Sequence, residues 1–314
     1  MEQKSLNARL ALQIAAPHTW AASVTPVLLT GAIVYRDYGN LNAVLFLVLL
    51  LICILMQSAV NTLNDYHDMI NGTDTKDDAV EASDAVLIYN DIAPVKARNL
   101  AVGFLAAAAL LAVYPVVHGG WRVLAIGLTG ALIVVLYSAG PKPLSHLPVG
   151  EVISGFVMGG LIPLGCYTTL TGVFYPGIMS ATLPVALGIA FIMLTNNTCD
   201  IVKDIPAGRK TLPVLLGRDR ALTLYRILMY AWIAVMGAYI IIFLPGLRTL
   251  TVPGTVLAAL ALIIFHVGMI LCFKQARLIK DALKRPKLMK RVSMATFLYG
   301  VSLSLAAYCV HLQL

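Results

Sequence analysis

The chain has 314 residues, of which 59% are hydrophobic and 12% are charged, and its formal net charge is +8. The charged fraction is about half of the roughly 25% that is typical of a soluble domain. This composition excludes a water-soluble globular protein, because a soluble core cannot bury so much apolar surface. The sequence contains no nucleic-acid-binding module either, so the lipid bilayer is the expected partner.

The predicted elements are apolar stretches of about 17 to 25 residues, the length that crosses a hydrocarbon layer of about 30 Å. In chain order, we expect spans near residues 19–35, 42–62, 97–117, 121–138, 150–170, 179–197, 221–244, 253–273 and 291–311. These spans leave no room for a separate soluble domain. The sequence therefore predicts one all-α domain over residues 1–314, a polytopic membrane protein with about nine transmembrane helices.

Lysine and arginine are distributed unevenly between the two sides of these spans. Of the 23 Lys and Arg residues, all but Arg36, Arg122 and Arg248 fall on the side of the amino terminus. The positive-inside rule then predicts a cytoplasmic amino terminus and an outward carboxyl terminus, in a cell (inner or plasma) membrane. The basic cluster from Lys274 to Arg291 could recruit an anionic substrate. We interpret it instead as a topology determinant resting on anionic lipid, with no catalytic role.

The five cysteines are scattered, with no Cys-x-x-Cys spacing. All but Cys199 fall inside apolar spans, and we expect the five to be buried, reduced thiols.

The connector after the second span is long and acidic, and it is predicted to lie on the cytoplasmic side. Asn61, Asn64, Asp65 and Asp68 recur there at three- and four-residue intervals, which places Asn61, Asp65 and Asp68 on one face if the helix continues past the membrane. Asp74 follows after an Asn-Gly turn.

The connector after the sixth span repeats this pattern on the same side. Asn196, Asp200 and Asp204 are spaced by four residues, with Asn197 adjacent, so we expect a second helical face of one amide and two carboxylates. Because the pattern occurs twice, at equivalent ends of two spans, we expect the two faces to serve one site.

The four aspartates of these motifs need a water-filled cavity or bound cations. A lipid-exposed charge at mid-membrane costs on the order of 3 kcal/mol on insertion. Clustered carboxylate and amide oxygens suit Mg²⁺, whose coordination shell is usually completed by water and substrate phosphate oxygens. Two other interpretations fit the same acids: solvated loop residues beside helix ends, and the coupling-cation site of a transporter. Transport is less favoured, because the acids sit at cytoplasmic loop junctions and not in the middle of broken helices.

At these residues the sequence resembles the UbiA superfamily of intramembrane aromatic prenyltransferases, and the resemblance covers nearly the whole chain. Within it, residues 64–68, 71–74, 195–204, 207–212 and 148–151 resemble the 1,4-dihydroxy-2-naphthoate polyprenyltransferases of menaquinone synthesis. The resemblance implies nine helices around a central cavity. It also implies transfer of a polyprenyl group from polyprenyl diphosphate to an aromatic acid, here 1,4-dihydroxy-2-naphthoate, giving demethylmenaquinone. Another acceptor such as 4-hydroxybenzoate is the alternative.

The resemblance also implies roles for individual residues. Magnesium ions would be held by Asp65, Asp68, Asp200 and Asp204, with Asn64 and Asn197 in the same shell. The remaining residues implied near the diphosphate or substrate are Asn61, Asp74, Tyr137, Ser138, Lys142, Asn196, Lys203, Arg209 and Lys210.

The sequence departs from the family at two places that would supply positive charge. The first span of relatives usually opens with Arg-Pro-Lys-Thr, whereas residues 16–19 here are Ala-Pro-His-Thr, and residues 77–91 contain no Arg where relatives commonly carry one. Positive charge must come from elsewhere, and the candidates are Lys142, Lys203, Arg209 and Lys210.

Glu151 opens the otherwise apolar fifth span. A carboxylate in the first turn of a helix is favoured by the helix dipole by about 0.3 to 1 kcal/mol, which could explain it without a catalytic role. The resemblance, in which Gly-Glu at this point accompanies naphthoate acceptors, favours a general base that draws a proton from a ring hydroxyl. We expect Glu151 to lie across the cavity from the metal ligands, near Tyr137.

Overall fold

A computed structural model describes residues 6–72, 86–244, 251–281 and 284–311. These residues form helices and connecting turns, and no strand occurs among them. The helices are α1 (Ala8–Ile14), α2 (Ala21–Tyr38), α3 (Ala43–Ile70), α4 (Val86–Tyr89), α5 (Pro94–Ser138), α6 (Gly150–Phe156), α7 (Ile162–Thr171), α8 (Ile178–Ala181), α9 (Leu183–Cys199), α10 (Ile201–Asp204), α11 (Leu212–Leu216), α12 (Arg218–Phe243), α13 (Val252–Leu278) and α14 (Arg285–His311). A π-helical turn over Val157–Leu161 joins α6 to α7.

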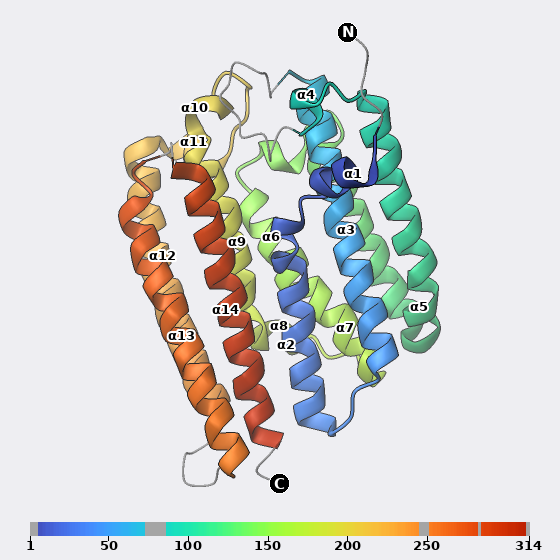
Figure 1. Cartoon of the computed structure of the whole chain (residues 1–314), viewed down its shortest axis with the longest axis vertical. Coiled ribbons are helices and arrows are strands. Elements are labelled where there is room, and N and C mark those ends of the chain that lie inside the picture. Colours follow the sequence, from blue (N-terminus) through green and yellow to red (C-terminus); the bar gives the residue numbers. More distant parts are fainter. Residues whose placement is uncertain (1–5, 73–85, 245–250, 282–283, 312–314) are drawn as a thin grey trace.

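The predicted all-α membrane fold is confirmed, and the long helices run roughly side by side (Figure 1). Among the described residues, six helical segments are long and apolar enough to cross a membrane: α3, α5, the segment from Gly150 to Thr171, α12, α13 and α14. The shorter α2 and α9 coincide with two further predicted spans. The total of nine crossings stays a prediction.

Helix α5 contains two of the predicted spans. Its 45 residues would extend to about 68 Å if straight, more than twice the hydrocarbon thickness. The helix is broken at Gly120, where φ is 73° and ψ is −162°, a conformation open to glycine. Both ends of α5 lie near the end of α3, because Ala97 packs in the cluster that Met69 joins, and Ser138 donates a hydrogen bond to Asn64. The two parts of α5 therefore form a hairpin.

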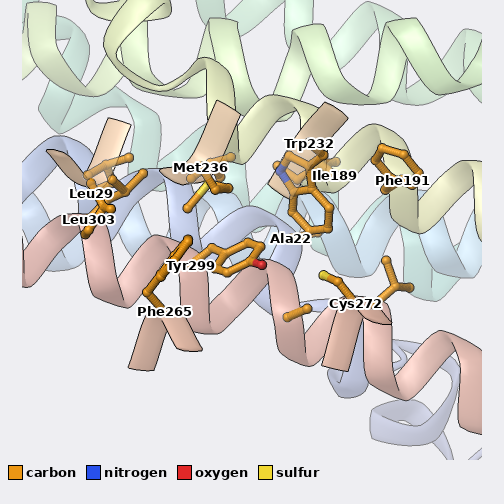
Figure 2. Close-up of a cluster of buried hydrophobic side chains, with 14 of the residues drawn as sticks. Ala22, Leu29, Ile189, Phe191, Trp232, Met236, Phe265, Cys272, Tyr299 and Leu303 are labelled. Carbon is orange, nitrogen blue, oxygen red and sulfur yellow. The ribbon is translucent and has the colours of Figure 1, made fainter. Parts of the chain in front are cut away.

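The main hydrophobic core lies where α2, α9, α12, α13 and α14 meet (Figure 2). Trp232 is its largest side chain; it stacks on Phe191 at 5.3 Å between ring centroids and donates a hydrogen bond to the carbonyl of Pro184 at 2.9 Å. Tyr299 meets the Trp232 ring edge-on at 5.1 Å. This core fixes α9 and α14, which carry polar residues of the site, relative to each other. The five cysteines are free thiols, as predicted, and four of them are buried.

The packing of the π-helical turn against α9 depends on glycine at position 159. A Cβ at Gly159 would lie 2.2 Å from Cβ and 2.3 Å from Cα of Ala186, so the helices can approach only because no side chain is present. We expect Gly159→Ala to lower the free energy of unfolding by about 1–3 kcal/mol through overpacking. Thermal unfolding in detergent measures this. Gly103→Ala, inside α5 where a Cβ would meet nothing within 4 Å, should leave the midpoint unchanged or raise it.

The predicted sidedness can be tested at two exposed positions. Asn40 follows α2, and Lys142 follows α5, and the charge distribution puts them on opposite sides of the membrane. In a background without the five native cysteines, Asn40→Cys should react with an impermeant maleimide from outside, and Lys142→Cys should react only after permeabilisation. Equal labelling of both variants in intact cells would mean that the predicted crossings are wrong.

Candidate active site

One cavity of about 1490 Å³ runs into the helix bundle. It exceeds the range of roughly 300–1,000 Å³ that is usual for small-molecule sites. Most of its wall is apolar and comes from α2, α3, α5, the α6–α7 segment, α9 and α14. Its polar lining includes both acidic motifs, which the sequence predicted to serve one site. The cavity therefore joins a charged end to a long apolar space.

The first motif lies on one continuous helix, as the spacing predicted, because α3 extends to Ile70. Asn61 and Asp65 line the cavity, together with Asn64 and Asp68 one turn further along. The amide nitrogen of Asn64 donates to Asp68 at 2.9 Å, and its oxygen accepts from Ser138 at 3.2 Å. These bonds hold the Asn64 side chain between α3 and the end of α5.

Asn61 fastens the segment before α2 to the same wall. Its amide nitrogen donates to the Thr19 hydroxyl at 2.8 Å and to the Ala15 carbonyl at 3.0 Å, while its oxygen accepts from Gln57 at 3.2 Å. Both N–H groups of the amide are therefore donated to protein partners, so a hydrogen bond from Asn61 to the diphosphate would require one of these two bonds to be exchanged.

The second motif is not one helical face, and this part of the prediction is wrong. Helix α9 ends at Cys199, and Asp200 has non-helical dihedral angles before the single turn of α10. Asn196, Asn197 and Asp200 line the cavity, and so does Lys203. Asp204 is instead turned into the protein, where it is 1% exposed. The helix end at Asp200 separates the second carboxylate from the first.

Arg209 connects the two motifs. Its guanidinium forms an ion pair with Asp68 on α3, and a second nitrogen lies 3.6 Å from Asp204. The turn that places it depends on Gly208, whose φ of 70° brings the Arg209 amide to the Asp204 carbonyl at 3.0 Å. Arg209 was a predicted source of positive charge, and it lies on the cavity wall.

Arg285 is a site residue that the sequence interpretation missed. It belongs to the basic cluster that was given no catalytic role, but its Nε lies 3.0 Å from Asp200, and its terminal nitrogen donates to the Asn196 amide oxygen. It lines the cavity with Pro286 and Lys290. One signal was present: residues 285–287 read Arg-Pro-Lys at the start of the last span, the triplet absent from the first.

The remaining predicted residues fall into three groups. Tyr137 lines the cavity, where its hydroxyl donates to the sulfur of Met193 at 3.2 Å. Ser138 is buried behind Asn64, and Lys142 and Lys210 are exposed and are not part of the wall. Asp74 lies outside the described residues. The diphosphate contacts predicted for Ser138, Lys142 and Lys210 stay predictions.

Glu151 lies beside the second motif. It is 6% exposed, and its Oε1 accepts a hydrogen bond from the amide nitrogen of Asn197 at 2.9 Å. The expected position across the cavity from the metal ligands is therefore wrong, because Asn197 is itself one of those predicted ligands. Its second oxygen, Oε2, is buried and has no hydrogen-bond partner among the described residues. Within the described part of the chain, Oε1 therefore accepts a hydrogen bond and Oε2 accepts none.

Burial and charge act in opposite directions on the groups behind the second motif. Burial raises the pKa of Asp204 to about 6, while the neighbouring Arg209 guanidinium lowers it and the nearby Asp200 carboxylate raises it further. Burial also lowers the pKa of His146, and Arg209 lowers it in the same direction. Burial is therefore the largest influence on the pKa of both Asp204 and His146, and the charge of Arg209 acts on both.

The carboxylate and amide oxygens of the two motifs can hold a hard divalent cation only if oxygens of the substrate complete its coordination shell. Among the described residues, no three His, Cys, Asp or Glu side chains lie close enough to hold a metal ion alone. The cavity wall nevertheless carries carboxylates and amide oxygens from both motifs. Mg²⁺ is commonly bound by one or two carboxylates with water and phosphate oxygens, so each motif offers a suitable half-site.

A family comparison agrees with this arrangement. The sequence profile of the UbiA prenyltransferase family matches residues 23–292. The chain belongs to this family. It is 34% identical over 222 residues to the 1,4-dihydroxy-2-naphthoate octaprenyltransferase of Bacillus subtilis, covering 71% of this chain and 70% of that protein. It is 28% identical over 230 residues to human UbiA prenyltransferase domain-containing protein 1, covering 73% of this chain and 66% of the human protein.

Solved structures of the family share the fold. A UbiA homolog from Archaeoglobus fulgidus, bound to DMAPP and Mg²⁺, has a TM-score of 0.60 at 18% identity, covering 93% of this chain and 98% of that one. The apo UbiA homolog from Aeropyrum pernix has a TM-score of 0.63 at 15% identity, covering 91% and 96%. At these identities the likeness concerns the helix arrangement, while the site residues rest on the geometry described above.

Proposed function

We propose that the protein transfers a polyprenyl group from a polyprenyl diphosphate to an aromatic acceptor, 1,4-dihydroxy-2-naphthoate, giving the prenylated diol (demethylmenaquinol), which oxygen then oxidises to demethylmenaquinone. The observation that carries this proposal is the single cavity, which brings two acidic motifs together with an apolar space large enough for a long isoprenoid chain. The identity to the B. subtilis octaprenyltransferase supports the naphthoate acceptor over other aromatic acids.

The charged end would hold the diphosphate through a divalent cation, for which Mg²⁺ is the proposed choice. The ligands are drawn from Asp65, Asp68 and Asp200 on the wall, with amide oxygens of Asn64 and Asn197. Asp204 would act from behind, by positioning Arg209. When bound, the metal neutralises negative charge that develops on the departing diphosphate.

The chain's own groups would assist departure of the diphosphate and then protect the reacting carbon. Lys203 and Arg209 line the charged end and stabilise the same developing charge. The allylic C–O bond breaks with its electron pair on the diphosphate, and a ring carbon of the acceptor attacks the resulting cation. The carboxylate on that ring carbon leaves as CO2, and the electron pair of the broken C–C bond returns to the ring. The apolar wall excludes water that would otherwise capture the cation.

We propose that the reaction takes place in the cell membrane, with the amino terminus and both acidic motifs on the cytoplasmic side. The uneven distribution of lysine and arginine supports this orientation. Transport of a cation-coupled solute is not favoured, since the family is one of prenyltransferases.

Product analysis tests the proposal directly. Purified protein in lipid nanodiscs would be incubated with Mg²⁺, a polyprenyl diphosphate and either 1,4-dihydroxy-2-naphthoate or 4-hydroxybenzoate, and the lipid extract analysed by mass spectrometry. We expect a prenylated naphthoquinone only with the naphthoate and only before addition of EDTA. A prenylated benzoate as the main product would assign the other acceptor. No product from any acceptor would contradict the proposed activity.

A further inference from the structure

Arg285 contacts a carboxylate that is also a proposed metal ligand, so a bound cation would repel its guanidinium. Its guanidinium contacts Asp200 and Asn196, two polar groups of the second motif, at the charged end of the cavity. The Arg285 side chain is 22% exposed and that of Asp200 is 14% exposed, so water screens this ion pair only in part. In the structure, the arginine supplies positive charge to this carboxylate.

A divalent cation at Asp200 would compete with this arginine for the same oxygens. The repulsion cannot be relieved by loss of a proton, because a guanidinium stays protonated in proteins. The guanidinium must then find another anion close by, since a desolvated, unpaired charge is costly. The ligand that arrives with the metal in the proposed reaction is a diphosphate, and a guanidinium matches phosphate oxygens with two parallel hydrogen bonds.

The other side of the cavity offers little competing positive charge. The lysines and arginines that line the cavity are Lys203, Arg209, Arg285 and Lys290, among the residues that the structure describes. The segment before α2 contributes Ala16, His18 and Thr19 to the wall, and none of these is a Lys or Arg. Arg209 is paired with Asp68 as Arg285 is paired with Asp200, so a cavity-lining carboxylate of each motif has an arginine partner.

We propose that Arg285 is a donor-binding residue: its guanidinium leaves Asp200 when a divalent cation binds there, and it then donates hydrogen bonds to the diphosphate of the isoprenoid. This inference rests on the proposed function and adds the first turn of α14 to the diphosphate site. It assigns to the basic cluster a substrate contact in addition to its place at the membrane surface.

The test separates a diphosphate contact from simple neutralisation of Asp200. Arg285→Gln removes the charge, and Lys287→Gln removes one charge from the same turn of α14 at an exposed position that does not line the cavity. Binding of inorganic pyrophosphate at saturating Mg²⁺ would be measured by calorimetry for each variant, with KM for donor and acceptor measured where turnover occurs.

We expect Arg285→Gln to weaken pyrophosphate binding and to raise the donor KM by about 10-fold or more, with the acceptor KM unchanged. Arg285→Lys, which keeps the charge but not the two-nitrogen geometry, should fall between the wild type and Arg285→Gln, and it serves if the Gln variant does not fold. Lys287→Gln should behave as wild type.

Wild-type pyrophosphate affinity in Arg285→Gln, with tighter Mg²⁺ binding, would overturn the inference, because it would mean that Arg285 only neutralises Asp200. Pyrophosphate binding does not require turnover. The inference therefore stays testable if the wild type makes no prenylated product, an outcome that would contradict the proposed function instead.

Discussion

Asp65→Asn and Asp200→Asn are each expected to lower kcat by about 10³-fold or more. Each substitution keeps the volume of the side chain and removes one carboxylate charge from the cavity wall, one from each motif. If both motifs hold cations that neutralise the departing diphosphate, the loss of either one raises the barrier to C–O cleavage by several kcal/mol. Initial rates of naphthoate prenylation at saturating donor and Mg²⁺ would measure the effect.

The control for this pair is Asp219→Asn. Asp219 is an exposed aspartate in the first turn of α12 and does not line the cavity. Its substitution should change stability by no more than about 0.3 to 1 kcal/mol, through the helix dipole, and leave turnover intact. Thermal unfolding of all three variants verifies folding. Turnover close to that of the wild type in either Asp65→Asn or Asp200→Asn would refute the shared site.

The fold could be predicted because membrane burial leaves a strong local signal. Apolar stretches of the required length mark the helices whatever their neighbours are, and each of the nine predicted stretches falls largely within a helix of the structure. The extension of α3 to Ile70 could also be anticipated, since the spacing of Asn61, Asp65 and Asp68 is that of a helix.

The sequence predictions were wrong or incomplete where the position of a side chain depends on where a helix ends or on contacts between residues far apart in the chain. The four-residue spacing of Asp200 and Asp204 predicts a shared face only if α9 continues, and no strong helix breaker marks its end at Cys199. Arg285 reaches Asn196 across 89 residues, and Arg209 reaches Asp68 across 141. A basic cluster beside a membrane span is fully accounted for by the positive-inside rule, so composition alone did not separate Arg285 from its neighbours.

The pairing of Glu151 with Asn197 changes how the proposed base must be tested. One carboxylate oxygen holds the amide nitrogen of Asn197, which leaves the Asn197 oxygen for other partners. The other oxygen, Oε2, is buried and unsatisfied by the described residues, and such a group carries a desolvation cost of about 1–3 kcal/mol or more. Glu151 is not itself part of the cavity wall, but its hydrogen-bond partner Asn197 is. We propose that a ring hydroxyl of the acceptor reaches the buried oxygen beside Asn197 and transfers its proton there.

We therefore expect Glu151→Gln to lower kcat for 1,4-dihydroxy-2-naphthoate by about 10²-fold, within the usual range for loss of a general base. Glutamine keeps an oxygen that can accept from Asn197, so donor affinity, measured without acceptor, should remain that of the wild type. An acceptor whose ring hydroxyl is more acidic should be affected less, because it needs less help to lose its proton. Weakened donor binding with no dependence on hydroxyl acidity would instead show that Glu151 acts only by positioning Asn197.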